Sequence, residues 1–111
     1  MIEKTILNYL NQHLVVEVYM EQPEKPPASY VVLEKTNGGE ANCINAATIA
    51  IQSYAKTMEQ AMDLNEDVKA AMKEITRLPS VASAKLNSDH NFTDTSTKRY
   101  RYQAIYNMNY Y

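Results

Sequence analysis

Tyrosine is concentrated at the end of this 111-residue chain, and its spacing there predicts a strand. Five of the nine tyrosines lie in residues 98–111. Side chains of a strand alternate between its two faces, so the even-numbered residues share one face: Tyr100, Tyr102, Ala104, Tyr106, Met108 and Tyr110. The odd-numbered face is mainly polar: Arg99, Arg101, Gln103, Asn107 and Asn109. We therefore expect a one-sided terminal strand whose aromatic face packs in the core or against a neighbouring subunit.

Apolar periodicity predicts the other elements. A short N-terminal amphipathic helix is indicated by Ile2, Ile6, Leu7 and Leu10. Residues rich in β-branched and aromatic side chains predict strands at 14–20, 30–35, 42–55 and 81–86. The run at 42–55 contains several alanines and is also compatible with a helix.

The segment that begins at Thr57 has the clearest helical pattern. Thr57 and Gln60 have the spacing of a capping box, and Glu59 places a negative charge in the first turn. The expected buried stripe consists of Met58, Ala61, Asn65, Val68, Met72 and Ile75. Pro79 disfavours helical geometry at Leu78, so the helix should end near Arg77.

Three polar segments should connect these elements. The prolines of residues 22–27 predict an extended loop, and Asn37-Gly38-Gly39 predicts a tight hairpin turn with positive φ angles. Residues 87–97 read as a polar connector before the terminal strand. The expected fold is one α+β domain, residues 1–111. It has a mainly antiparallel sheet of four to five strands, an N-terminal helix and one long amphipathic helix packed on the sheet.

Composition disfavours several classes of function. A net charge of -2 and a pI near 5.6 offer no general attraction for phosphate backbones, so we expect no nucleic-acid partner. Cys43 is the single cysteine, which excludes an internal disulfide and fits a reducing compartment. The N-terminal residues are interrupted by polar side chains and no long apolar run follows, so neither export nor membrane insertion is expected.

The candidate catalytic residues form only a weak pattern. Asp89 and His90, with Ser88, Asp94 and Ser96 nearby, are the residue types of a nucleophile, a base and an orienting carboxylate, but the same side chains serve ordinary polar turns. Cys43, His13 and His90 lack the spacing of a zinc site, and Gly38-Gly39 lacks the surroundings of a phosphate-binding loop. We expect neither an enzyme nor a bound cofactor or metal.

One binding alternative stays open for the terminal strand. Tyr100 and Tyr102 have the side chains that stack on bases, while Lys98, Arg99 and Arg101 have the charges that contact phosphates. A small RNA-binding or regulatory module is therefore the alternative function. Packing of the tyrosines beneath the methionine-bearing helix explains the same pattern without a ligand and is favoured.

Several segments together resemble the small tail-completion proteins of long-tailed bacteriophages and prophages, the tail-terminator or head-tail joining group. The resemblance lies in residues 30–35 leading into Gly38-Gly39, and in residues 44–54, 58–69 and 92–106. It implies an α+β subunit of a hexameric ring that caps the head-proximal end of the tail tube, ends tube growth and joins the capsid connector. The implied partners are other copies of the chain, the tail-tube protein and connector proteins. The implied location is the virion neck, with host cytoplasm during assembly.

Interface residues are predicted by region, since long polar loops between patterned elements commonly carry binding functions. The segments 22–27, 37–40 and 87–97 and the polar face of the last strand are the candidates. The residues selected are Asn37, Gly38, Gly39, Glu40, Asp89, His90, Asn91, Arg99, Arg101 and Gln103.

Overall fold

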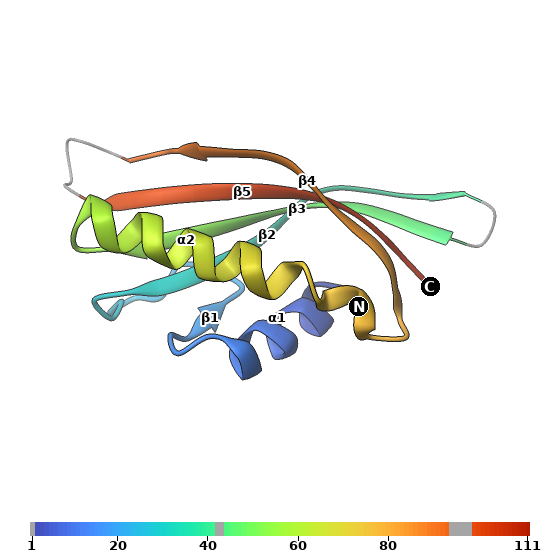
Figure 1. Ribbon diagram of the computed structural model, residues 1–111, viewed down its shortest axis with the longest axis horizontal. Helices are drawn as coiled ribbons and strands as arrows, with labels where there is room; N and C mark the ends of the chain where they lie inside the picture. Colours follow the sequence, from blue (N-terminus) through green and yellow to red (C-terminus); the bar gives the residue numbers. More distant parts are fainter. Residues whose placement is uncertain (1, 42–43, 94–98) are drawn as a thin grey trace.

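The structure, a computed structural model, describes residues 2–41, 44–93 and 99–111. The helices are α1 (Ile2–His13), α2 (Met58–Met72) and a short 3-10 turn, η1 (Ile75–Arg77). The strands are β1 (Val18–Tyr19), β2 (Tyr30–Ala41), β3 (Ile44–Ala55), β4 (Val81–Asn91) and β5 (Tyr100–Tyr110) (Figure 1). This order of one helix, three strands, one helix and two strands is the order expected from the sequence.

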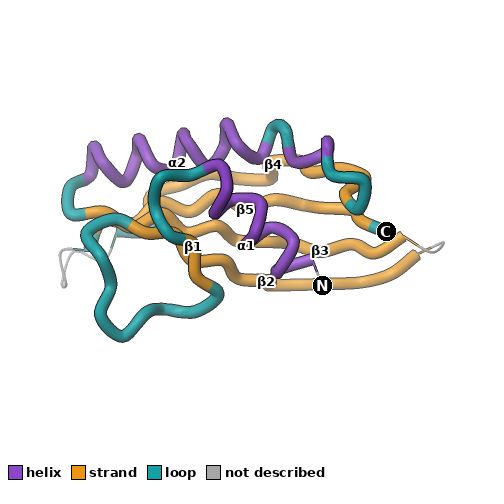
Figure 2. Tube along the Cα trace, turned by 90° about the horizontal axis from the view of Figure 1, so that it is seen from below, coloured by secondary structure: helices purple, strands orange, loops and turns teal. Residues whose placement is uncertain are grey.

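The strands form one mixed sheet in the order β1-β2-β3-β5-β4. β1 pairs with β2 in parallel, and the other neighbours are antiparallel. Both helices lie on the same side of this sheet (Figure 2). The α+β fold is therefore confirmed, and within residues 2–41, 44–93 and 99–111 no helix covers the other face of the sheet. We call that face the open face.

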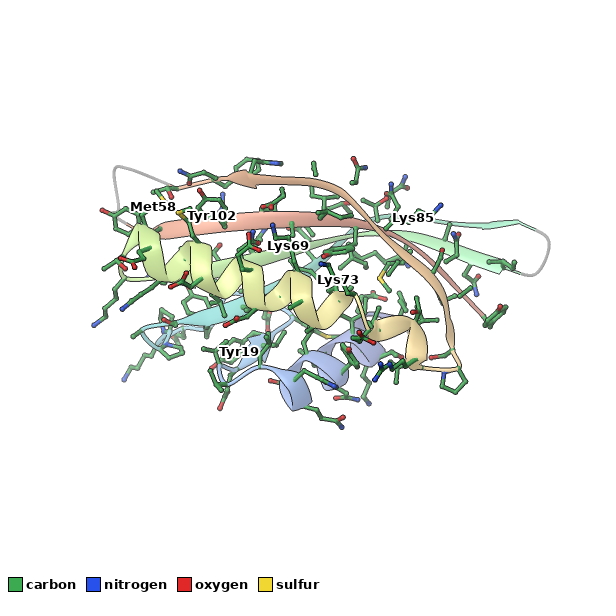
Figure 3. The ribbon with its side chains drawn as sticks, in the orientation of Figure 1. Tyr19, Met58, Lys69, Lys73, Lys85 and Tyr102 are labelled. Atoms are coloured by element: carbon green, nitrogen blue, oxygen red, sulfur yellow. The ribbon has the colours of Figure 1, made fainter. Side chains whose placement is uncertain are left out.

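The terminal strand has the sidedness that its alternation predicts. Ala104, Tyr106 and Met108 of β5 are buried on the helix side. Tyr110 packs partly against the same cluster, and Tyr102 is half-buried toward the N-terminal end of α2 (Figure 3). The centre of β5 thus completes the core, because its apolar positions face α2 and β3 in register.

The long helix begins where its capping pattern predicts. The Thr57 hydroxyl accepts a hydrogen bond from the Gln60 backbone N–H at 3.2 Å, which satisfies one of the free donors of the first turn. The buried side of α2 is lined by Ala61, Leu64, Asn65, Val68 and Met72. Met62, in contrast, is 46 % exposed. The α-helix ends at Met72, and η1 carries the chain on to Arg77.

The predicted hairpin turn at Asn37-Gly38-Gly39 is wrong. These residues lie inside β2 and pair with Thr48, Ala47 and Ala46 of β3, and neither glycine has a left-handed backbone. The small residues on the facing strand allow two glycines within the ladder without a turn. The connection between β2 and β3 falls at residues 42–43, outside the described residues.

Other boundaries also differ from the sequence prediction. The strand expected at 14–20 is restricted to Val18–Tyr19. The strand expected at 81–86 continues to Asn91, so residues 87–91 are not part of a connector. Residues 94–98 of the predicted connector lie outside the described residues.

β4 forms one edge of the sheet, and its register is irregular. It shifts relative to β5 between Val81 and Ser83 and again between Leu86 and Ser88. Each shift leaves one residue of β4 without an opposite partner, as in a β-bulge. At the other side of the sheet, the paired ends of β2 and β3 extend past the helices as an arm (Figure 1).

Candidate functional site

The strand register determines which side chains share the open face. Tyr30 of β2 lies opposite Tyr54 of β3, and Tyr54 lies opposite Arg101 of β5. At the next position on this face, Gln52 lies opposite Gln103. Because residues two apart on a strand point the same way, these side chains form two neighbouring rows across the sheet.

The outer row is aromatic and contains one arginine. We define the aromatic row as Tyr30, Tyr54, Arg101, Phe92 and His90. The Tyr30 and Tyr54 rings stack with their centroids 4.7 Å apart and their planes at 2°. This is the close cross-strand contact expected of directly opposed tyrosines.

Arg101 lies between two aromatic rings. Its guanidinium carbon is 5.7 Å from the Tyr54 ring centroid and 5.4 Å from that of Phe92. One guanidinium nitrogen donates to the Tyr54 hydroxyl at 3.1 Å. Both rings therefore hold the cation by cation–π attraction.

Arg101 has no carboxylate partner among the residues that the structure describes. Its Nε atom is buried and lacks a hydrogen-bond partner. That atom is enclosed by the protein, so a ligand would meet the remainder of the guanidinium. The positive charge without a carboxylate partner favours an anionic or carbonyl-bearing ligand.

Phe92 and His90 extend the row to the β4 edge. Their ring centroids are 4.3 Å apart, and Phe92 is 41 % exposed. The backbone N–H of Phe92 donates to the Arg101 carbonyl at 2.8 Å, which fixes the two residues side by side. An exposed aromatic ring at this edge adds apolar area to the open face.

The inner row is a polar network that supports Tyr54. The Tyr54 hydroxyl donates to the Gln52 Oε1 at 3.2 Å, and the Gln52 amide donates to Gln103 at 3.3 Å and to Glu34 at 3.4 Å. Glu34 is the acidic group of this network. The Tyr54 side chain contacts Tyr30 and Arg101 in the outer row and Gln52 in the inner row, and these contacts together fix its orientation.

A shallow pocket adjoins the Tyr30 end of the aromatic row. It has a volume of about 160 Å³ and is lined by prolines of the 22–27 loop, by the two stacked tyrosines, and by Lys56 and Arg99. Both cations are exposed, and neither forms an ion pair within the described part of the chain. The pocket therefore continues the cationic and aromatic character of the row.

Four of the residues predicted from the sequence share the open face or its rim. They are His90, Arg99, Arg101 and Gln103. Asn37, Gly38 and Gly39 line a separate hollow of about 270 Å³ on the β2–β3 arm. Glu40 lies in β2 opposite Asn45, also on the arm.

Asp89 and Asn91, also predicted as interface residues, have structural partners. Asp89 accepts hydrogen bonds from Asn65 at 2.7 Å and from Lys69 at 2.5 Å, across the helix side of the sheet (Figure 3). Its contact with Lys69, together with that of Glu66, raises the pKa of the Lys69 ammonium. The Asn91 side chain accepts from the Thr93 backbone at 2.8 Å.

The acid–base pair considered from the sequence does not form. Asp89 points to α2 and His90 to the open face, so the two side chains lie on opposite sides of β4. Asp94 and Ser96 lie outside the described residues. Within the described ranges, no three His, Cys, Asp or Glu side chains gather as a metal site.

A larger groove of about 670 Å³ lies between α1 and α2. His13 stacks on Tyr9 there at 4.1 Å, and the Tyr9 hydroxyl donates to the Ala71 carbonyl at 2.6 Å. Burial raises the pKa of Tyr9. The Tyr9–Ala71 hydrogen bond joins the two helices, and the groove is lined mainly by apolar surface.

Sequence reasoning missed Tyr30, Tyr54 and Phe92 as site residues. One signal was present, since Phe92 is the chain's single phenylalanine and stands in a polar segment. The Tyr30–Tyr54 contact depends on the register of two strands and has no local signature.

No protein-family model matches the chain, and no curated protein matches it either. Within the described residues, no helix combines the length and the apolar character needed to cross a bilayer.

Proposed function

We propose that this protein is a non-enzymatic assembly subunit of a long-tailed bacteriophage or prophage. It caps the head-proximal end of the tail tube, ends tube growth and/or joins the tube to the capsid connector. This role is the one implied by the resemblance described above. The partners are other copies in a hexameric ring, the tail-tube protein and the connector, and the site of action is the virion neck.

The observation that carries the proposal is the aromatic row on a helix-free sheet face. An assembly subunit needs surface that becomes buried only when partners arrive, and exposed aromatic and arginine side chains are typical of such surface. Phe92, which is 41 % exposed, and the half-buried Arg101, which has no carboxylate partner among the described residues, meet this description. The β2–β3 arm provides a second extended surface, suited to reaching a neighbour.

Electron microscopy of particles assembled without this protein tests the proposal. Overlong tails would identify a tail terminator, and normal tails detached from full heads would identify a joining protein. Restoration by the wild-type chain is the control. Infectious particles of normal length and attachment in its absence would refute an assembly role.

RNA binding is a second candidate function, and the same row favours it. The exposed Phe92 ring beside Arg101 on the open face is able to stack on a base. The tyrosines of β5 that first suggested it, Tyr100 and Tyr102, are half-buried on the helix side instead, opposite the buried Ala55 and Ser53. Tight single-stranded RNA binding that weakens steeply with salt would favour this function over assembly.

A further inference from the structure

Charge on this molecule is divided between two surfaces. The net charge of -2 describes the whole chain and does not reveal this local separation of charge. Lys56, Arg99 and Arg101 form a cationic group at one end of the open face. The first turns of α2 have exposed carboxylates on their outer side.

The acidic surface is a stripe along the first turns of α2. We define the acidic stripe as Glu59, Met62, Asp63 and Glu66. These positions are three, four and seven residues apart and therefore share one side of the helix. Met62 is 46 % exposed in their midst.

Two of the three carboxylates of the stripe have no cationic partner among the described residues. Glu66 pairs with Lys69 at 2.8 Å. Glu59 and Asp63 form no ion pair with any residue that the structure describes. An exposed methionine flanked by unpaired carboxylates complements a surface of aromatic rings and unpaired cations.

We infer that the aromatic row, with Lys56 and Arg99, binds the acidic stripe of a second copy of this chain. Met62 of one copy lies against the exposed Phe92 ring and the half-buried Tyr54 ring of the next. Glu59 and Asp63 of the stripe lie near Lys56 and Arg99 of that copy. The inference rests on the proposed function for its biological role, because it names the contact by which ring neighbours join.

The placement of the stripe is compatible with a closed ring. Asn65 and Lys69 bind Asp89, so their side of α2 faces β4. Met62 lies about two turns before Lys69, and Glu66 lies about one turn before it. Both therefore lie toward the side of α2 that carries Lys69. Glu59 and Asp63 lie farther round the helix, on the side away from the buried residues of α2, so the stripe is exposed and is a different patch from the aromatic row. Docking the stripe on the row of another copy relates each copy to the next by the same rotation. Contacts between two different patches close into rings when such a rotation repeats.

The test uses the purified full chain and sedimentation velocity over a concentration series. Wild type should self-associate, and raising NaCl from about 50 to about 500 mM should weaken the association roughly tenfold or more. The variant Lys56→Glu/Arg99→Glu and the variant Glu59→Lys/Asp63→Lys should each be monomeric. The chain that carries all four substitutions should associate again, because the two charges are exchanged.

Lys85→Glu is the matched control. Lys85 lies on the open face opposite Asn107, away from the aromatic row, and points away from α2 (Figure 3). Its reversal should leave association unchanged. Circular dichroism should show wild-type secondary structure for every variant, since all the substituted side chains are exposed. In dilute protein the melting temperatures should stay within a few degrees of wild type, the largest decrease being that of Glu59→Lys/Asp63→Lys, which removes the acidic side chain of the first helical turn.

Three results would overturn the inference. The first is a wild-type chain that stays monomeric up to its solubility limit, and the second is a four-substitution chain that stays monomeric although folded. The third is binding of a single-stranded oligonucleotide that Lys56→Glu/Arg99→Glu abolishes and Glu59→Lys/Asp63→Lys spares, which assigns the row to nucleic acid. If the solution contact behaves as expected but phage with Lys56→Glu/Arg99→Glu has normal tails, the contact stands and the proposed function fails.

Discussion

The two faces of the sheet should respond very differently to the same substitution. Ile51 of β3 is 0 % exposed beneath the helices, whereas Ile105 of β5 is only half-buried on the open face. Both lie on central strands. Replacing each isoleucine by alanine therefore removes the same atoms from two environments that differ mainly in burial.

The expected magnitudes follow from that burial. Ile51→Ala leaves a cavity that rigid neighbours on three sides cannot fill, so it should reduce the free energy of unfolding by about 3 to 4 kcal/mol. Ile105→Ala leaves a gap that solvent can enter, and it should cost about 1 kcal/mol. For a chain of this size each kcal/mol lowers the melting temperature by about 4 °C. Ile51→Ala should thus melt about 12 to 16 °C below wild type and Ile105→Ala about 4 °C below it.

Thermal and urea unfolding of dilute protein, at concentrations where the melting temperature no longer depends on concentration, would measure both values. Equal losses for the two variants would contradict the assignment of one covered and one open face. A larger loss for Ile105→Ala would reverse the assignment altogether.

Three further predictions concern the helix side. Thr57→Ala should cost about 1 kcal/mol by removing the helix cap, while Thr57→Ser should be close to wild type in urea unfolding. Asp89→Ala should cost about 1 to 3 kcal/mol because Asn65, 2 % exposed, loses its acceptor, and Asp89→Asn should cost less; equal losses would argue against the hydrogen bond. Burial raises the pKa of Tyr106, so the folded state holds that proton more tightly; its stabilising effect is present below pH 10 and is lost as pH rises further. Tyr106→Phe should therefore flatten the alkaline end of the stability curve, and an unchanged curve would contradict this cause.

Local patterns in the sequence were sufficient for the elements whose side chains have one clear periodicity. The alternation of Tyr106 and Met108 with polar residues identified β5 and its buried face. The spacing of Thr57 and Gln60 identified the start of α2. In both cases neighbouring residues supply the whole signal, so no knowledge of distant contacts was needed.

Elements that depend on distant partners were not predicted. Residues 87–91 look like a loop because they are polar, but Asp89 is satisfied by Asn65 and Lys69 of α2, which makes a polar strand stable there. Gly38 and Gly39 look like a turn, yet alanines of β3 lie opposite them.

The candidate site was predicted only in part for the same reason. Its center is Arg101, which the sequence placed on the exposed side of the last strand. The aromatic rings that hold it come from residues 54 and 92. Those neighbours are set by the register of three strands and not by spacing along the chain.

The two irregularities of β4 have a consequence for the protein at high concentration. An edge strand with free backbone groups is a template for fibril growth, because a foreign strand can pair along its whole length. In β4 the regular pairing is divided into Ser83–Leu86 and Ser88–Asn91, and the exposed Lys85 lies within the first segment. A foreign strand without bulges can therefore pair in register with β4 over only one of these two short segments at a time. The β4 edge is therefore a poor template for strand-by-strand aggregation at high protein concentration.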